Sequence, residues 1–270
     1  IFVTSSAFPT IRGNTITGNR ASAGGGIFVI DNAWPVIEGN TIVDNEADEH
    51  GGGIFVELLA APRIRGNTIR GNRALSGGGM IVFNYANAEI SDNRITGNRA
   101  GHAGGALFIG ASAEATLGAN EFSANEATSG GAIYCELGSN LIILGNTFDD
   151  NAASFTGGAI DTGGCYVELR GNTLTANRGE RGGAIYDGGH SSMSIEANTF
   201  DGNQASQGGG LFHAGSTETS LRVNEFLNNR AQQGGAMWLS AETILDISDP
   251  DDNLFSGNQP EDVYEETEDG

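Results

Sequence analysis

The stretch GNTITGNRASAGGGIFV, residues 13–29, holds the unit from which most of the chain is built. Lightly edited copies return as GNTIRGNRALSGGGMIV at 66–82 and as GNTFDDNAASFTGGAI at 145–160. Each copy has two asparagines five positions apart, a large apolar residue between them, and a glycine run that leads into a second apolar segment. Repetition at a fixed period is typical of a solenoid, in which every copy is one structural unit.

The asparagines keep their register over ten copies, with intervals of 26 or 27 residues and one of 29 before the last copy. The first asparagines are Asn14, Asn40, Asn67, Asn93, Asn120, Asn146, Asn172, Asn198, Asn224 and Asn253. Stacked asparagines at a sharp turn can bond the amides of the turns above and below, which satisfies backbone that would otherwise be buried unpaired. We therefore expect internal asparagine ladders along the solenoid.

The apolar segments are too short for helices, which need roughly 10–12 residues, so they predict strands. Parallel strands stacked at about 4.8 Å would place like residues on like. The columns of the sequence have that pattern, with Ile on Ile and Phe on Phe. The expected fold is an all-β, right-handed parallel β-helix of about ten turns of about 26 residues, with three short strands per turn and a length of roughly 45–50 Å.

The repeat predicts one β-helix domain over residues 1–260. IFV at 1–3 matches the IFV that follows the glycines at 24–26 and 51–53, so the chain is expected to begin inside a turn, N-terminally incomplete. An open first turn presents an unpaired strand edge, which predicts self-association. Residues 261–270 are expected to be an acidic tail or linker, the alternative being a strand that covers the last turn.

Charge limits the partners. The chain carries 13 arginines, no lysine and a net charge of −21. Nucleic acids need clustered cations, so no nucleic-acid partner is expected. No apolar run approaches the ~18 residues of a membrane span, so no membrane insertion is expected.

A family resemblance rests on two motifs. GGAI at 157–160 and 182–185, combined with F-x-x-N at 148–151, 200–203 and 226–229, resembles the repeats of chlamydial polymorphic outer membrane proteins. The wider GNTITGN pattern is similar to right-handed β-helix repeat proteins with the pectate-lyase-like fold. The resemblance implies a bacterial protein that is extracellular or on the cell surface, in a group that contains adhesins, lyases and hydrolases.

Acidic residues and histidines gather on consecutive turns. Glu136, Asp161, Asp187 and His213 fall within two positions of one column, and His190 lies three residues beyond Asp187. Pectinase-like enzymes present carboxylates and histidine as acid, base and metal ligands on one face of a β-helix. These residues are therefore candidate catalytic groups, although the short loops favour a solvated polar patch instead.

An aromatic column follows the glycine runs and is a candidate binding surface: Phe28, Phe55, Phe108, Tyr134, Tyr186, Phe212 and Trp238. If the strands alternate, these rings face outward and would contact sugar rings or another protein. The alternative is that they pack inward or under the glycine-containing loops.

Two further features stay open at this stage. Asp249, Asp251 and Asn253 have the 1-3-5 spacing of calcium ligands, but the glycine at position 6 is missing and Pro260 stands at position 12, where a Glu belongs. The alternative to a calcium site is an acidic turn, and no cofactor other than calcium is expected. Cys135 and Cys165 lie on adjacent turns, and a disulfide requires their Cα atoms to come within roughly 7 Å.

The leading interpretation is a non-enzymatic, secreted or cell-surface β-helix module that acts as a stalk, fibre subunit or adhesin, with a carbohydrate or another surface protein as partner. The alternative is a polysaccharide lyase or glycoside hydrolase that uses the carboxylate and histidine patch. A minor alternative is ice binding through an outward threonine column, which Arg94 and Glu121 interrupt.

Overall fold

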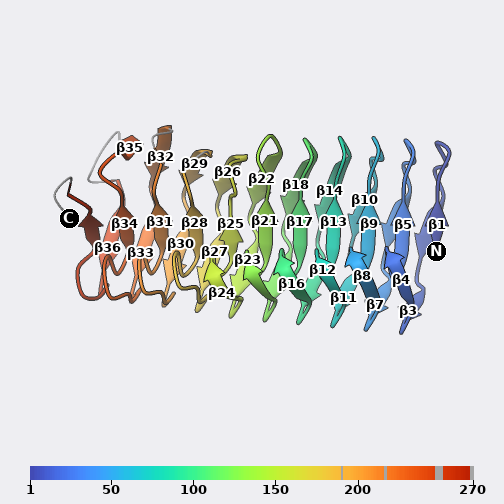
Figure 1. Cartoon of the computed structure of the whole chain (residues 1–270), viewed down its shortest axis with the longest axis horizontal. Coiled ribbons are helices and arrows are strands. Elements are labelled where there is room, and N and C mark those ends of the chain that lie inside the picture. Colours follow the sequence, from blue (N-terminus) through green and yellow to red (C-terminus); the bar gives the residue numbers. More distant parts are fainter. Residues whose placement is uncertain (190, 216–217, 247–251, 268–270) are drawn as a thin grey trace.

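The computed structural model describes residues 1–189, 191–215, 218–246 and 252–267, which form a straight rod of stacked turns with the two termini at opposite ends (Figure 1). Every pairing between named strands is parallel and joins one turn to the next, in an 11-stranded, two 10-stranded and one 6-stranded sheet. The predicted solenoid of about ten turns is confirmed. The described residues contain no helix that is long and apolar enough to cross a membrane.

Sheet A, the 11-stranded sheet, begins each turn after the glycine run. Its middle position is the aromatic column, as in the register Phe28↔Phe55. Its strands are β1 (Phe2–Val3), β5 (Ile27–Val29), β9 (Ile54–Val56), β13 (Met80–Val82), β17 (Leu107–Ile109), β21 (Ile133–Cys135), β25 (Ile160–Asp161), β28 (Ile185–Asp187), β31 (Leu211–His213), β34 (Met237–Leu239) and β37 (Val263–Glu265).

Sheet B follows in each turn and ends at the first asparagine. Its strands are β2 (Thr10–Arg12), β6 (Val36–Glu38), β10 (Arg63–Arg65), β14 (Asn87–Ser91), β18 (Glu114–Gly118), β22 (Asn140–Leu144), β26 (Tyr166–Arg170), β29 (Ser192–Glu196), β32 (Glu218–Arg222) and β35 (Ile244–Asp246).

Sheet C lies between the two asparagines of each turn. Its strands are β3 (Thr15–Thr17), β7 (Thr41–Val43), β11 (Thr68–Arg70), β15 (Arg94–Thr96), β19 (Glu121–Ser123), β23 (Thr147–Asp149), β27 (Thr173–Thr175), β30 (Thr199–Asp201), β33 (Glu225–Leu227) and β36 (Leu254–Ser256).

Sheet D adds a fourth strand to six turns, where the sequence predicted three strands per turn. It is built from the alanine-rich segment after the second asparagine, and it continues beyond β24 as single bridges such as Thr156↔Arg181 and Arg181↔Gln207. Its strands are β4 (Arg20–Ala23), β8 (Glu46–His50), β12 (Arg73–Ser76), β16 (Arg99–Ala103), β20 (Glu126–Ser129) and β24 (Ala152–Thr156).

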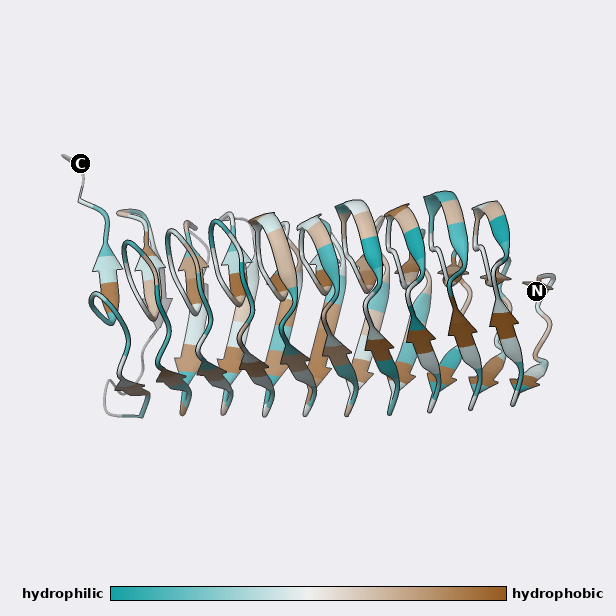
Figure 2. Cartoon of the chain, turned by 90° about the horizontal axis from the view of Figure 1, so that it is seen from below, coloured by the Kyte–Doolittle hydropathy of each residue, from teal (hydrophilic) through white to brown (hydrophobic). Residues whose placement is uncertain are grey.

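The core is a set of columns in which like residues stack, visible as hydrophobic bands that recur from turn to turn (Figure 2). In sheet C the ring centroids of Phe122 and Phe148 lie 4.8 Å apart with nearly parallel planes. Those of Phe200 and Phe226 lie 4.6 Å apart. All four rings are fully buried. Neighbouring turns therefore bury each other's apolar faces, and no single turn has a core of its own.

The expected asparagine ladders are present at both asparagine positions. Asn67 Oδ1 accepts from the backbone N–H of Asn40 at 2.8 Å and from Asn40 Nδ2 at 3.0 Å. Asn67 Nδ2 donates in turn to Asn93 Oδ1 at 3.0 Å and to the Ile37 carbonyl at 2.8 Å. Gly66, just before it, has a φ of +61°, a left-handed conformation that glycine adopts without a steric penalty. This explains the recurring Gly-Asn pair.

The segment assigned to the acidic tail contributes a strand in the structure. β37 pairs with β34 in parallel through Val263↔Met237 and Tyr264↔Trp238. Sheet A therefore continues beyond residue 260, as in the alternative that the sequence left open.

Candidate functional site

The strongest polar feature of the described chain lies inside the rod. Asp187 ends β28 and His213 ends β31, and the two residues face each other in register. His213 Nδ1 is 2.7 Å from Asp187 Oδ2, and neither side chain is exposed. Side chains at this strand position point inward, and in most other turns the residue there is aliphatic, as at Val82 and Leu239. A carboxylate and an imidazole thus replace core methyl groups.

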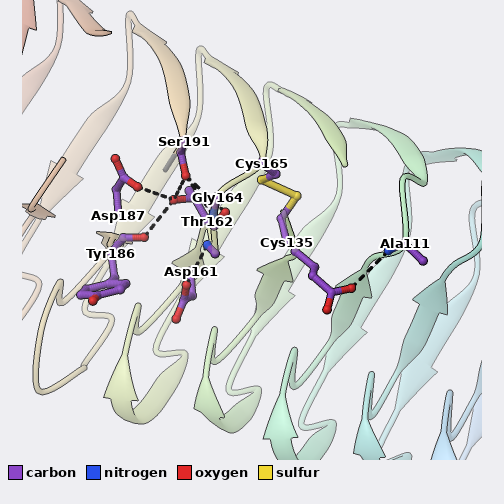
Figure 3. Close-up of a disulfide and its surroundings, with 11 residues drawn as sticks. Ala111, Cys135, Asp161, Thr162, Gly164, Cys165, Tyr186, Asp187 and Ser191 are labelled. Atoms are coloured by element: carbon purple, nitrogen blue, oxygen red, sulfur yellow. Dashed lines mark hydrogen bonds between the residues drawn. A yellow bond between two sulfur atoms is a disulfide. The ribbon is translucent and has the colours of Figure 1, made fainter. Parts of the chain in front are cut away.

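The network continues towards the N-terminus. Thr162 Oγ1 lies 3.3 Å from Asp187 Oδ1, and Ser191 Oγ donates to Thr162 Oγ1 at 2.7 Å (Figure 3). The Gly189 N–H also donates to Asp187 Oδ1 at 3.1 Å. Buried polar groups of this kind are tolerated when they are hydrogen-bonded to one another.

Electrostatics keep Asp187 ionised. Burial opposes its ionisation, but the hydrogen bond to His213, the Gly189 N–H and the charge of His213 together lower the pKa of Asp187 from its usual 3.8. An ionised carboxylate only accepts hydrogen bonds, so His213 Nδ1 donates to it. His213 Nε2 is buried and has no hydrogen-bond partner among the described residues.

Asp161 occupies a different side of sheet A. It takes the place of an aromatic residue in the middle column, between Tyr134 and Tyr186. It is 3 % exposed and accepts hydrogen bonds from Thr156 Oγ1 and from the Gly163 N–H, the latter at 3.0 Å. Burial raises the pKa of Asp161 to about 6, against the effect of these two bonds and with a smaller contribution from the charge of Asp187.

The two tyrosines beside Asp161 respond to the same environment. The pKa of Tyr134 is raised by burial first and then by the charges of Asp161 and Glu136. The pKa of Tyr186 is raised by burial and by Asp161, while Arg181 opposes the rise. Both phenols therefore stay neutral and cannot supply a base at neutral pH.

Of the two remaining catalytic candidates, Glu136 joins neither group. Glu136 is half-buried in the turn after β21, and its Oε2 accepts from the Ala111 N–H at 3.2 Å. His190 lies outside the described residues. The sequence placed the candidates on one face, whereas the structure divides Asp161 from Asp187 and His213, because neighbouring strand positions point to opposite sides of a sheet.

The aromatic column is not part of the core, yet the glycine segment before each strand of sheet A packs against it, as Gly24 does against Phe28 and Gly51 against Phe55. Phe55, Phe212 and Trp238 are 5 %, 4 % and 5 % exposed, and Phe28, Phe108, Tyr134 and Tyr186 are half-buried. The rings stack along the rod, with 4.3 Å between the centroids of Phe212 and Trp238 and 5.2 Å between those of Phe108 and Tyr134. The open outward stripe expected from strand alternation is therefore not present at the most buried rings, which form a second apolar layer.

Little of the proposed calcium site can be located. Asp249 and Asp251 lie outside the described residues. Asn253 is 8 % exposed and belongs to the asparagine ladder, where its Oδ1 accepts from the N–H and the Nδ2 of Asn224 at 2.9 and 3.1 Å. Within the described ranges, no group of three or more His, Cys, Asp or Glu side chains is arranged to hold a metal ion.

A disulfide joins Cys135 to Cys165, a pairing that the sequence left open (Figure 3). The two Cα atoms are 5.9 Å apart, and both side chains are in the core. Disulfides persist in oxidising compartments, which bears on where such a protein works.

The outer face of sheet B has a hollow that was not predicted from the sequence, lined by Phe8, Trp34 and Arg63 among others. The signal for it was present in three dipeptides at the same register: Phe8-Pro9, Trp34-Pro35 and Ala61-Pro62.

The chain matches the family described as "Right handed beta helix region" over residues 1–122 and 61–259, two overlapping matches that together span most of its length. It belongs to this right-handed β-helix family, and the predicted handedness and fold class agree with that membership. The likeness to the chlamydial repeats stays a motif resemblance. No match was found among curated proteins or among solved structures.

Proposed function

We propose that the chain is a non-catalytic β-helix module of a secreted or cell-surface bacterial protein, acting as a rigid, adhesin-like spacer. The observation that carries this proposal is the complete burial of Asp187 and His213. A general acid or base must come within hydrogen-bond reach of its substrate. A polysaccharide cannot reach these two groups without opening the rod.

The regularity of the rod supports the same role. Successive turns repeat one backbone register, and the asparagine ladders hold the turns rigidly. About ten turns at ~4.8 Å give a spacer of roughly 45–50 Å. The Cys135–Cys165 disulfide favours an oxidising, extracellular compartment.

The enzyme alternative has weaker support. Asp161 has the raised pKa that a general acid needs, but its side chain is 3 % exposed and is hydrogen-bonded to Thr156. Ice binding has less support still, because Arg94 and Glu121 form an ion pair in the middle of the outward threonine column.

The decisive experiment is a sensitive search for products. The protein is incubated with neutral and acidic polysaccharides, with and without Ca²⁺, and new reducing ends and unsaturated sugars are measured. We expect neither product. Turnover that disappears in Asp161→Asn or Asp187→Asn would replace the proposed function by the enzyme alternative.

A further inference from the structure

The outer face of sheet B is hollowed over the first four turns of the rod. The hollow has a volume of about 430 Å³ and is lined by Phe8, Trp34, Val36, Arg63 and Glu89, among others. Phe8 and Trp34 are 81 % and 58 % exposed. Large aromatic rings that leave most of their surface in water commonly mark contact sites.

A second, smaller hollow continues the first along the same sheet. It has a volume of about 170 Å³, shares Asn87 with the first hollow and ends at Tyr166, which is half exposed. We call the two together the sheet B groove. It runs parallel to the rod axis, since its residues recur at one register in successive turns.

The aromatic end of the groove is held rigidly. The Trp34 N–H donates to the Ala7 carbonyl at 2.8 Å, and the Val36 N–H donates to the Pro9 carbonyl at 2.9 Å. A residue that precedes proline is restricted to extended conformations, which applies to both Phe8 and Trp34. The rings therefore stand on a preorganised backbone and lose little entropy when a ligand binds.

Polar groups line the groove beside the rings. Arg63 Nε lies 2.9 Å from Glu89 Oε2 in an exposed ion pair, and Asn87 Nδ2 donates to Glu114 Oε2 at 2.9 Å. Each of these side chains keeps further donors or acceptors, which suits a ligand rich in hydroxyl groups.

Charge indicates an uncharged ligand. The first 100 residues carry eight arginines and nine acidic residues, whereas the remaining 170 carry five arginines and 25 acidic residues. The aromatic end of the groove thus lies in the nearly neutral part of the chain. Arg63, the cation among the lining residues of the first hollow, is already paired with Glu89, so this hollow has no unpaired cation that could bind an acidic sugar.

We propose that the sheet B groove binds an uncharged glycan chain, with sugar rings packed on Trp34 and Phe8 and hydroxyl groups bonded to Arg63, Glu89 and Asn87. Four turns span about 14 Å, which fits a short oligosaccharide, and the volume lies in the usual range of ligand sites. The inference deepens the adhesin-like role proposed above and rests on it for the class of partner.

The test is affinity electrophoresis of the whole chain through gels that contain soluble mixed-linkage β-glucan, xylan, galactomannan or dextran, with polygalacturonate as an acidic control. We expect retardation by at least one neutral polysaccharide. The affinity calculated from the retardation should fall at least tenfold in Trp34→Ala and severalfold in Arg63→Met. Phe155→Ala is the matched control, because Phe155 is an exposed aromatic residue of β24, outside the groove, and it should bind as the native protein does.

Fluorescence gives a second readout. Trp34 is the exposed tryptophan of the chain's two, since Trp238 is 5 % exposed, so a shift in emission on adding the retarding polysaccharide reports on the groove. Absence of retardation by every neutral polysaccharide, equal retardation of Trp34→Ala, or stronger retardation by polygalacturonate would overturn the inference. The release of reducing ends in the same samples would count against the proposed function instead, which separates the two failures.

Discussion

His213 and Asp187 form a hydrogen-bonded pair, 2.7 Å between Nδ1 and Oδ2, at a core position where Val82 and Ile109 stand in earlier turns. Removing one member of a buried pair leaves the other charge or dipole uncompensated, at a cost of about 3–5 kcal/mol. Replacing both by aliphatic residues removes that penalty. We expect Asp187→Val alone and His213→Leu alone each to lower the unfolding temperature strongly, and the two substitutions together to match or exceed the native value.

Thermal unfolding of the two single variants and the double variant checks this, because non-additivity is the signature of direct coupling. A loss in the double variant equal to the sum of the two single losses would show that Asp187 and His213 are not coupled.

Asp161 should give the protein a stability that depends on pH. Its folded pKa of about 6 lies above the usual 3.8, so the folded chain holds a proton that the unfolded chain has released in that interval. Its contribution is fully present below pH 3.8 and is lost as the pH rises through about 6. Asp187, with a lowered pKa, acts in the opposite sense and loses its contribution as the pH falls.

We therefore expect Asp161→Asn to be more stable than the native protein at pH 7.5, by about 3 kcal/mol at most, with little difference at pH 4. Urea unfolding at the two pH values measures it. Asp92→Asn, at an exposed carboxylate, serves as the control and should show no such pH-dependent gain. A gain of equal size at both pH values would rule out a raised pKa as its cause.

The disulfide should stabilise the rod without being needed for its fold. Cys135 and Cys165 are 30 residues apart, and a crosslink over that length is worth about 3–4 kcal/mol in the chain-entropy account. The Cys135→Val and Cys165→Ala double variant gives the two positions the residue types of earlier turns, where Val82 and Ala113 stand. We expect the same circular dichroism spectrum and a lower unfolding temperature, equal to that of the native protein under reducing conditions. An unchanged unfolding temperature would be the contrary result.

The fold was predictable because each turn repeats its inward residues, so Asn14 and its successors fix both period and register. Sheet D was not predictable from strand patterns, since segments such as Glu126–Ser129 are rich in small residues and pair only because their neighbours stack. The candidate site was only partly predictable. Ile27 and Val29 are buried on either side of the half-buried Phe28, so strand alternation in sheet A predicts that Asp187 and His213 point inward. Grouping residues only by their nearness to one column of the repeat ignored this alternation and placed them on the same face as Asp161.

The middle of an asparagine ladder should matter more than its end. Asn125 Oδ1 accepts from both the N–H and the Nδ2 of Asn98, at 3.0 and 3.1 Å, and Asn125 Nδ2 donates to the Ile95 carbonyl at 2.9 Å. Asn125→Ala leaves these buried groups without hydrogen-bond partners, which lowers the free energy of unfolding by about 1–3 kcal/mol for each group. Asn19 is exposed at the end of the same ladder, and Asn19→Ala should cost less than about 1 kcal/mol. Similar losses in urea unfolding for both variants would contradict a cooperative ladder.

Val223 should be a strained position that glycine relieves. It precedes the ladder residue Asn224 and has a φ of +55°, which is unfavourable for a β-branched residue, whereas Gly171 stands at the equivalent position with a φ of +65°. Left-handed conformation costs roughly 1–2 kcal/mol, and the greater freedom of glycine in the unfolded chain offsets about half of that. Val223→Gly should therefore gain about 0.5–1 kcal/mol, and Gly171→Val should lose a similar amount, since nothing lies within 4 Å of a Cβ added at Gly171. Calorimetry of the two variants should show unfolding temperatures that move in opposite directions, and a shift in the same direction for both would mean that the backbone conformation at this turn is not what limits stability.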